Sequence, residues 1–142
     1  PRPVRRLPQH SGPAGCPIMS QFYDRTAATA ARLLANFGQP ISITRTSGGT
    51  YDPLTGETTG QTTTTYTPDG VLLNYSAGES GELRAAGVDI VSTDKKLLCA
   101  AFEVDPVVTD TVTVGGLDWT VMRVKTLSPA GAAVLHELQV RR

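Results

Sequence analysis

The sequence predicts a mainly β protein, a small antiparallel β-barrel or sandwich with one N-terminal α-helix and a long hairpin loop. Three observations support this fold class. Only residues 20–37 show a convincing helical period, about six or seven short strand-like runs follow, and Gly, Pro and Asp residues mark the turns between them. At 142 residues the chain suits a single domain with an appendage.

The N-terminal segment, residues 1–18, differs from the rest in composition. It holds five prolines, and its arginines, Arg2, Arg5 and Arg6, make it basic. Proline blocks helix formation and removes backbone donors, so we expect an extended arm that contacts a partner subunit. A disordered tail, phosphate contacts by the arginines, and a leader upstream of a start at Met19 are the alternatives. Residues 19–142 then form the single β-rich domain.

The helix is predicted between Ser20 as N-cap and Gly38, which would supply a left-handed stop. Its apolar stripe is expected to pack on the β-body, with Asp24, Arg25 and Arg32 on the opposite side. The alternative is that part of this face meets another protomer. The stripe consists of Phe22, Thr26, Ala30, Leu33, Leu34 and Phe37.

The strand predictions rest on alternation and on β-branched or aromatic residues. Trp119, Val121 and Val124 are expected to anchor the core, whereas residues 76–87 are interpreted as a flexible linker. A hairpin is predicted around residues 115–118. Residues 88–91 are interpreted as a brief strand or an extended piece, and the predicted strands cover residues 41–46, 61–67, 71–75, 97–102, 111–114, 119–125 and 134–140.

The stretch from Arg45 to Tyr66 is the feature around which we organise the functional interpretation. It is expected to be two threonine-rich strands joined by a long polar loop, residues 47–61, and long loops are usually functional or disordered. We interpret it as an arm that reaches a neighbour or a shared space; an ordinary hairpin tip is the alternative. The residues expected to matter are Gly48, Gly49, Tyr51, Asp52, Pro53, Gly56 and Glu57.

Composition and motifs argue against several functions. Thirteen basic and thirteen acidic residues give no net charge, which disfavours a general nucleic-acid binder. No apolar run approaches the ~18 residues of a membrane helix, and the N-terminus lacks the apolar region of a secretory signal, so we expect intracellular synthesis and no membrane partner. Cys16 and Cys99 are expected to be free thiols, with Cys99 in the core.

Catalytic signatures are not found in the sequence. The motifs of serine hydrolases and of phosphate-binding loops are missing, and His10 and His136 are far apart without clustered cysteines. We therefore expect no catalytic residues, no metal site and no cofactor, and hence a protein that is not an enzyme.

From Met19 onward, a series of segments carries a family resemblance. They are FYDR at 22–25, RLL at 32–34, FG at 37–38, TRTSGGTYDPLTGETT at 44–59, DKKLL at 94–98, WTV at 119–121, VKTLSPAG at 124–131 and VLHELQVR at 134–141. In this whole pattern the chain resembles the head-completion, or head–tail joining, proteins of tailed bacteriophages. Residues 1–18 lie outside the resemblance.

The resemblance implies a structural virion protein. Such proteins form a ring in the phage neck, below the portal or adaptor; they close the DNA-filled head and offer a docking surface to a tail terminator or tail-tube protein. A loop that acts as a stopper in related neck proteins corresponds here to residues 47–61. In a ring of six or twelve copies, Asp52 and Glu57 would make an acidic lumen that repels passing DNA without binding any sequence.

The same interpretation places the protein in the virion neck after assembly in the host cytoplasm. Partner contacts are expected from Arg2, Arg5, Arg6, Phe22, Arg25, Arg32, Arg141 and Arg142. One alternative is a tail terminator or another ring-forming tail protein, which would differ in partner and place. A less favoured alternative is a non-viral small-barrel binding module, which should be monomeric.

Overall fold

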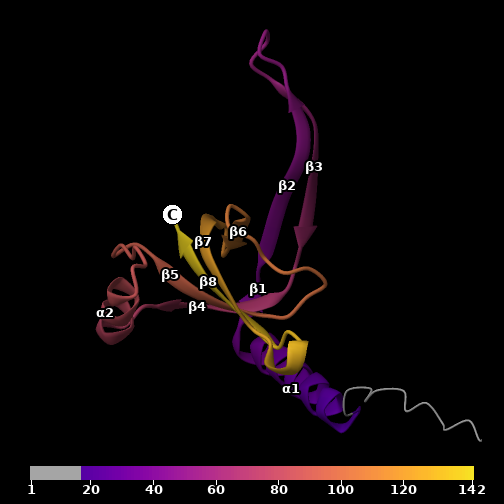
Figure 1. Cartoon of the computed structure of the whole chain (residues 1–142), viewed down its shortest axis with the longest axis vertical. Helices are drawn as coiled ribbons and strands as arrows, with labels where there is room; N and C mark the ends of the chain where they lie inside the picture. The colour runs from indigo at the N-terminus through magenta and orange to yellow at the C-terminus, as the bar shows by residue number, and fades with distance from the viewer. Residues whose placement is uncertain (1–16) are drawn as a thin grey trace, which may run out of the picture.

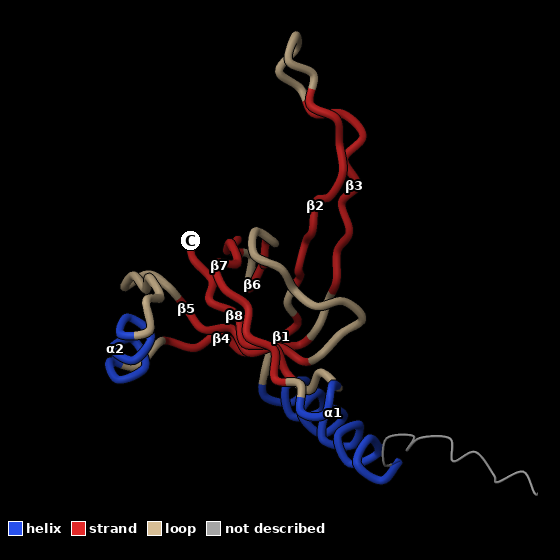
Figure 2. Tube along the Cα trace, in the orientation of Figure 1, coloured by secondary structure: helices blue, strands red, loops and turns tan. Residues whose placement is uncertain are grey.

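The computed structural model describes residues 17–142, with side chains from residue 21 onward, as two α-helices, one 3-10 turn and a single antiparallel sheet (Figures 1 and 2). The predicted N-terminal arm falls almost wholly outside the described residues, and so do Arg2, Arg5 and Arg6. Its last two residues, Pro17 and Ile18, belong to the first helix.

Eight strands form the sheet, in the order β1-β4-β5-β8-β7-β6-β2-β3. The sheet curls into a half-barrel and remains open, with β1 and β3 as its edges. This confirms the predicted mainly β class with an N-terminal helix. The strands are β1 (Gln39–Pro40), β2 (Ser42–Tyr51), β3 (Thr58–Tyr66), β4 (Asp69–Asn74), β5 (Lys95–Ala100), β6 (Thr111–Val114), β7 (Leu117–Leu127) and β8 (Leu135–Arg141).

One hydrophobic core is formed by buried side chains of the sheet and of Ile41, which lies between β1 and β2. Trp119 and Val121 belong to it and Val124 packs against it, as predicted. Burying these apolar side chains is the main favourable term for the fold. The buried cluster consists of Ile41, Ile43, Leu97, Cys99, Val112, Val114, Trp119, Val121, Leu138 and Val140.

The hairpin of β6 and β7 is confirmed and tighter than expected. Val114 pairs with Leu117, so the turn contains only Gly115 and Gly116. Both glycines have positive φ, 57° and 80°, as a two-residue turn requires. Residues 88–91, in contrast, form no strand.

The first helix, α1 (Pro17–Phe37), lies against β1, β4 and β5. It begins three residues before Ser20, so the predicted N-cap at Ser20 is wrong. Gly38 does not have positive φ, and its role is close packing: a Cβ there would lie 2.5 Å from the carbonyl oxygens of Gly70 and Leu34. Glycine thus lets the end of α1 approach β4.

A second helix, α2 (Ala77–Ala85), occupies the segment that we expected to be a flexible linker. Ser76 and Glu79 form a capping box, in which each side chain accepts a hydrogen bond from the other residue's backbone N–H. Glu79 also pairs with Lys96 on β5. The contact with Lys96, together with the bonds to Ser76, lowers the pKa of Glu79 to about 2.

Candidate functional site

The candidate site is a two-stranded arm, residues 46–64, that projects from the half-barrel (Figure 1). Only Ser42, Ile43 and Thr44 of β2 pair with β6, whereas the β2–β3 ladder continues to the Tyr51–Thr58 pair. The predicted loop of residues 47–61 is therefore mostly strand, and the connection itself spans only residues 52–57. The sequence prediction placed the arm correctly and misjudged its structure.

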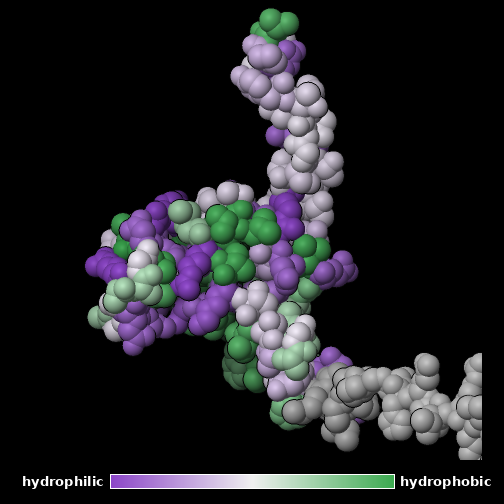
Figure 3. All heavy atoms as spheres, viewed as in Figure 1, coloured by the Kyte–Doolittle hydropathy of each residue, from purple (hydrophilic) through white to green (hydrophobic). Residues whose placement is uncertain are grey.

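The arm has no core of its own. From Thr46 to Thr65 every side chain is exposed, apart from the half-buried Asp52. The space-filling view shows the arm as a pale column of weakly polar residues that ends in an apolar tip (Figure 3). Its strands are thus held mainly by the ladder hydrogen bonds, with one long hydroxyl–hydroxyl contact of 3.4 Å between Thr46 and Thr63, and an isolated two-stranded ribbon is marginally stable in water. Such an element is suited to gain order by contact with another surface.

The tip is a closed turn. The Asp52 backbone N–H donates to the Glu57 carbonyl at 2.9 Å, and the Gly56 N–H donates to the Asp52 carbonyl at 2.8 Å. The Leu54 N–H donates to the Asp52 carboxylate at 2.9 Å. This turn presents Leu54 almost fully to solvent, with 95% of its surface exposed. The sequence interpretation missed Leu54, although a leucine between Pro53 and a polar turn was a visible signal.

Glycines interrupt the ladder part-way along the arm. Gly49 lies opposite Gly60, and this is the one position between the Ile43–Tyr66 and Tyr51–Thr58 pairs where no pair forms. Gly48, Gly49 and Gly60 have φ of 74°, 100° and 78°, a region that other residues rarely adopt. The interruption divides the arm into a segment next to the body and a distal segment that carries the tip.

A partly buried ion pair lies at the base of the arm. The Arg45 guanidinium donates to both carboxylate oxygens of Asp110, at 3.0 and 2.8 Å, and also to the Asp105 carbonyl at 2.8 Å. Asp110 is 2% exposed. The hydrogen bond to Asp110 raises the pKa of Arg45, so the guanidinium stays charged. This two-pronged geometry ties β2 to the loop that precedes β6.

Charge on the arm is confined to its tip. Asp52 and Glu57 are the only ionisable side chains with a formal charge between Arg45 and Asp69. The remaining residues are mainly threonine, serine, glycine and glutamine. The arm therefore offers hydroxyl groups and negative charge, and it offers no cation that could bind a phosphate.

The outer face of α1 forms a second exposed surface, and here the predicted packing on the body holds only for Ala30 and Leu34 of the stripe. Tyr23, Ala27, Ala30, Ala31 and Leu34 lie against the body. The other members of the predicted stripe point away from it. Phe22, Leu33 and Phe37 are 62%, 50% and 81% exposed. Small alanines on the inner face let the helix approach the sheet closely. The alanine side of the helix is therefore the side that packs against the body.

Arg25 and Arg32, two predicted partner contacts, are exposed on α1 beside this outer face. Arg141 and Arg142 were predicted in the same role. Arg142 is exposed, whereas Arg141 donates to both Asp94 carboxylate oxygens, at 2.7 and 2.9 Å. The involvement of Arg141 in a partner contact stays a prediction.

Asp94 is the centre of a polar cluster inside the chain. Gln139 donates to it at 2.7 Å and the Val91 N–H at 3.1 Å, in addition to Arg141. Burial raises the pKa of this carboxyl, but the bonds from Arg141, Val91 and Gln139 outweigh burial and leave the pKa lowered. Asp94 and Arg141 are 47 positions apart in the sequence, so no local sequence signal predicted that they pair.

The other chemically distinctive side chains are buried in the body. Cys99 is a free buried thiol, as predicted, and burial raises its pKa to about 12, so it is unreactive at neutral pH. His136 is also fully buried. Its Nδ1 lies 3.0 Å from the Thr126 hydroxyl, and burial lowers its pKa despite the nearby Asp105 carboxylate.

Two further observations complete the description of residues 17–142. Within this range no three His, Cys, Asp or Glu residues are grouped as a metal site would require. None of the helices in this range combines the length and apolarity needed to cross a membrane.

Comparison with known proteins identifies no family model that matches this chain and no curated relative.

Proposed function

We propose that this protein is a structural subunit of a tailed-phage neck. Copies of it form a ring that closes the DNA-filled head below the portal or adaptor and provides the docking surface for the tail. The observation that carries the proposal is the arm of residues 46–64: a two-stranded ribbon, exposed apart from the half-buried Asp52, that is held at its base by Arg45. The resemblance of residues 19–142 to head-completion proteins supplies the biological setting.

The chemistry of the arm suits a channel through which DNA passes. Its surface is hydroxyl-rich and its only charges, Asp52 and Glu57, are negative. Repeated around a ring, these carboxylates repel the phosphate backbone, so DNA moves past without being retained by ionic contacts. The unpaired Gly49–Gly60 position supplies a place where the distal segment can bend.

The exposed surfaces of the body suit a ring of copies. The sheet is open, and its β3 edge carries neither lysine nor proline to prevent pairing with another chain. The outer face of α1 is apolar and exposed. A monomeric protein rarely leaves both kinds of surface uncovered.

Cryo-electron microscopy of the phage particle tests the place of the protein. We expect a ring between portal and tail, with residues 52–57 facing the channel. A ring that caps the tail tube and makes no contact with portal or adaptor would instead make the protein a tail terminator, and a particle that lacks the chain would contradict the proposal.

Arm excision tests the stopper role directly. Thr46 pairs with Thr63, so residues 47–62 can be replaced by an Asn-Gly turn that closes the shortened hairpin in register. We expect the variant to fold and enter particles, and tailless heads to lose their DNA. Asp52→Asn combined with Glu57→Gln keeps the length of the arm and removes its charges, so it separates the contribution of the carboxylates from that of the arm itself. Heads that retain DNA after excision would contradict the stopper role.

A further inference from the structure

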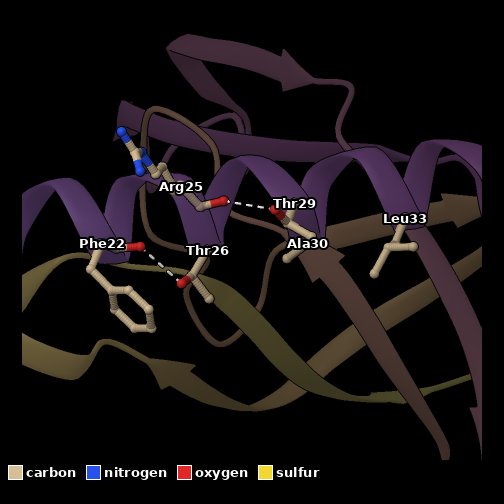
Figure 4. A pocket seen from close by; sticks show the side chains of 6 residues that line it. All are labelled: Phe22, Arg25, Thr26, Thr29, Ala30 and Leu33. Carbon is tan, nitrogen blue, oxygen red and sulfur yellow. Dashed lines mark hydrogen bonds between the residues drawn. The ribbon is translucent and has the colours of Figure 1, made fainter.

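The exposed stripe of α1 is an apolar surface with a defined charge pattern at its border. Phe22, Thr26 and Leu33 lie on one side of the helix and line a shallow groove (Figure 4). Phe37 continues the same side one turn on and is 81% exposed. Arg25 and Arg32 are seven residues apart, two helical turns, and therefore flank the stripe on the same side. Asp24 points about 100° farther round the helix, so the surface is apolar with a basic border.

The loop between β5 and β6 carries the opposite pattern. Val107 and Val108 are 45% and 50% exposed, and they are the only adjacent pair of exposed large hydrophobics among the described residues. Glu103 and Asp105 are exposed just before them. No lysine or arginine occurs from Leu97 to Met122. The nearby Arg45 is already paired with Asp110, so the loop surface is apolar with an acidic border.

The loop is also held in one conformation. The Val107 N–H donates to the Asp110 carboxylate at 2.9 Å, and the Thr109 N–H donates to the Val121 carbonyl at 3.0 Å. Thr109 has φ of 82°, which is strained for a β-branched residue. Strained residues persist where the surrounding structure fixes them, and they cluster at binding and functional sites. The two valines thus lie on a turn that internal hydrogen bonds brace, and bracing of this kind reduces the entropy lost on binding.

We propose that the exposed α1 stripe of one copy docks on residues 103–108 of the next copy, with Arg25 and Arg32 facing Glu103 and Asp105. The two surfaces match in both apolarity and charge. They lie on different parts of the chain: α1 runs below the half-barrel in Figure 1, and the β5–β6 loop runs out from its side. The contact is therefore head-to-tail, and a head-to-tail contact that closes produces a ring. The ring depends on the proposed function, whereas the contact can be measured on the purified chain.

Charge reversal and compensation test the contact. Arg25→Glu with Arg32→Glu places like charges against the loop, and we expect self-association, measured by analytical ultracentrifugation, to weaken at least about tenfold. Adding Glu103→Arg and Asp105→Arg to the same chain restores opposite charges at every contact, and self-association should return. The wild-type contact should also weaken as salt is raised.

A control variant separates the contact from general effects of charge. Glu82→Arg reverses an exposed charge on α2, outside both the α1 stripe and residues 103–108, and should leave self-association unchanged. Circular dichroism of each variant checks that the fold is intact.

The outcomes are decisive for the contact whatever the place of the protein in the particle. Failure of the four-residue charge swap to restore association, or a wild-type chain that stays monomeric at its solubility limit, would overturn the inference. Restoration by the swap in a protein that is not found in the neck would leave the contact established and reject the proposed function.

Discussion

Strand β2 belongs to two regions of the molecule that are stabilised in different ways. Its first residues lie in the half-barrel, where Ile43 is fully buried and paired on both sides. From Thr46 onward the same strand is exposed and pairs only with β3. The body is thus held by burial of apolar surface, and the arm by ladder hydrogen bonds. The difference implies that the arm can change its conformation without unfolding the body.

The largest effect is expected in the core. Leu138→Ala removes a fully buried side chain and should lower the free energy of unfolding by about 2–5 kcal/mol in urea titrations. The matched arm variant, Thr62→Ala, should change it by less than about 0.5 kcal/mol, since Thr62 is exposed. Equal losses would mean that arm and body unfold as one tightly coupled unit.

An intermediate effect is expected at the boundary of the two regions. Arg45→Ala leaves the buried Asp110 carboxylate without its ion-pair partner, and we expect a loss of about 1–3 kcal/mol in the free energy of unfolding. Arg45→Lys keeps the charge without the two-pronged geometry and should fall in between. The exposed Arg142→Ala is the control. A loss for Arg45→Ala no larger than for Arg142→Ala would show that the pair does not anchor the arm.

The smallest effect on global stability is expected within the arm. Gly49→Ala forces a side chain into φ of 100° and places a Cβ 2.8 Å from side-chain atoms of Thr58 and Gln61. Amide hydrogen exchange should accelerate in residues 46–63 and stay unchanged in β5, β7 and β8. Gly78→Ala is the matched control, because a Cβ there meets open space. Uniform acceleration across the chain would contradict the independence of the arm.

Local signals predicted the half-barrel well. Alternation located most strands, and Gly115 and Gly116 marked the tight hairpin. The predictions were wrong where we inferred a flexible conformation from glycine- and serine-rich composition. The glycine- and serine-rich stretch around α2 looked like a linker, although Ser76 and Glu79 carried the spacing of a capping box. The glycines of the arm suggested a loop, yet the threonines between them continue both strands.

The remaining features depend on contacts between residues far apart in the sequence. Arg45 and Asp110 are 65 residues apart, so no single segment reveals that they pair. The orientation of α1 was equally hidden: an apolar stripe and a row of small alanines lie on neighbouring sides of the helix, and the shape of the sheet surface decides which one is buried. The phage setting and the ring stay predictions.

The Arg45 attachment has a mechanical consequence. The six residues from Thr46 to Tyr51 span ~20 Å at the usual rise of an extended strand, so the arm is a lever of about that length. Among side chains of the described β2 and β3 strands, only Arg45 is hydrogen-bonded to the loop before β6, through Asp110 and the Asp105 carbonyl. A lateral force on the tip should therefore be transmitted to the loop that carries Val107 and Val108. We therefore expect displacement of the tip to be coupled to the surface proposed to hold the neighbour, through the Arg45 guanidinium and the adjoining β2–β6 ladder.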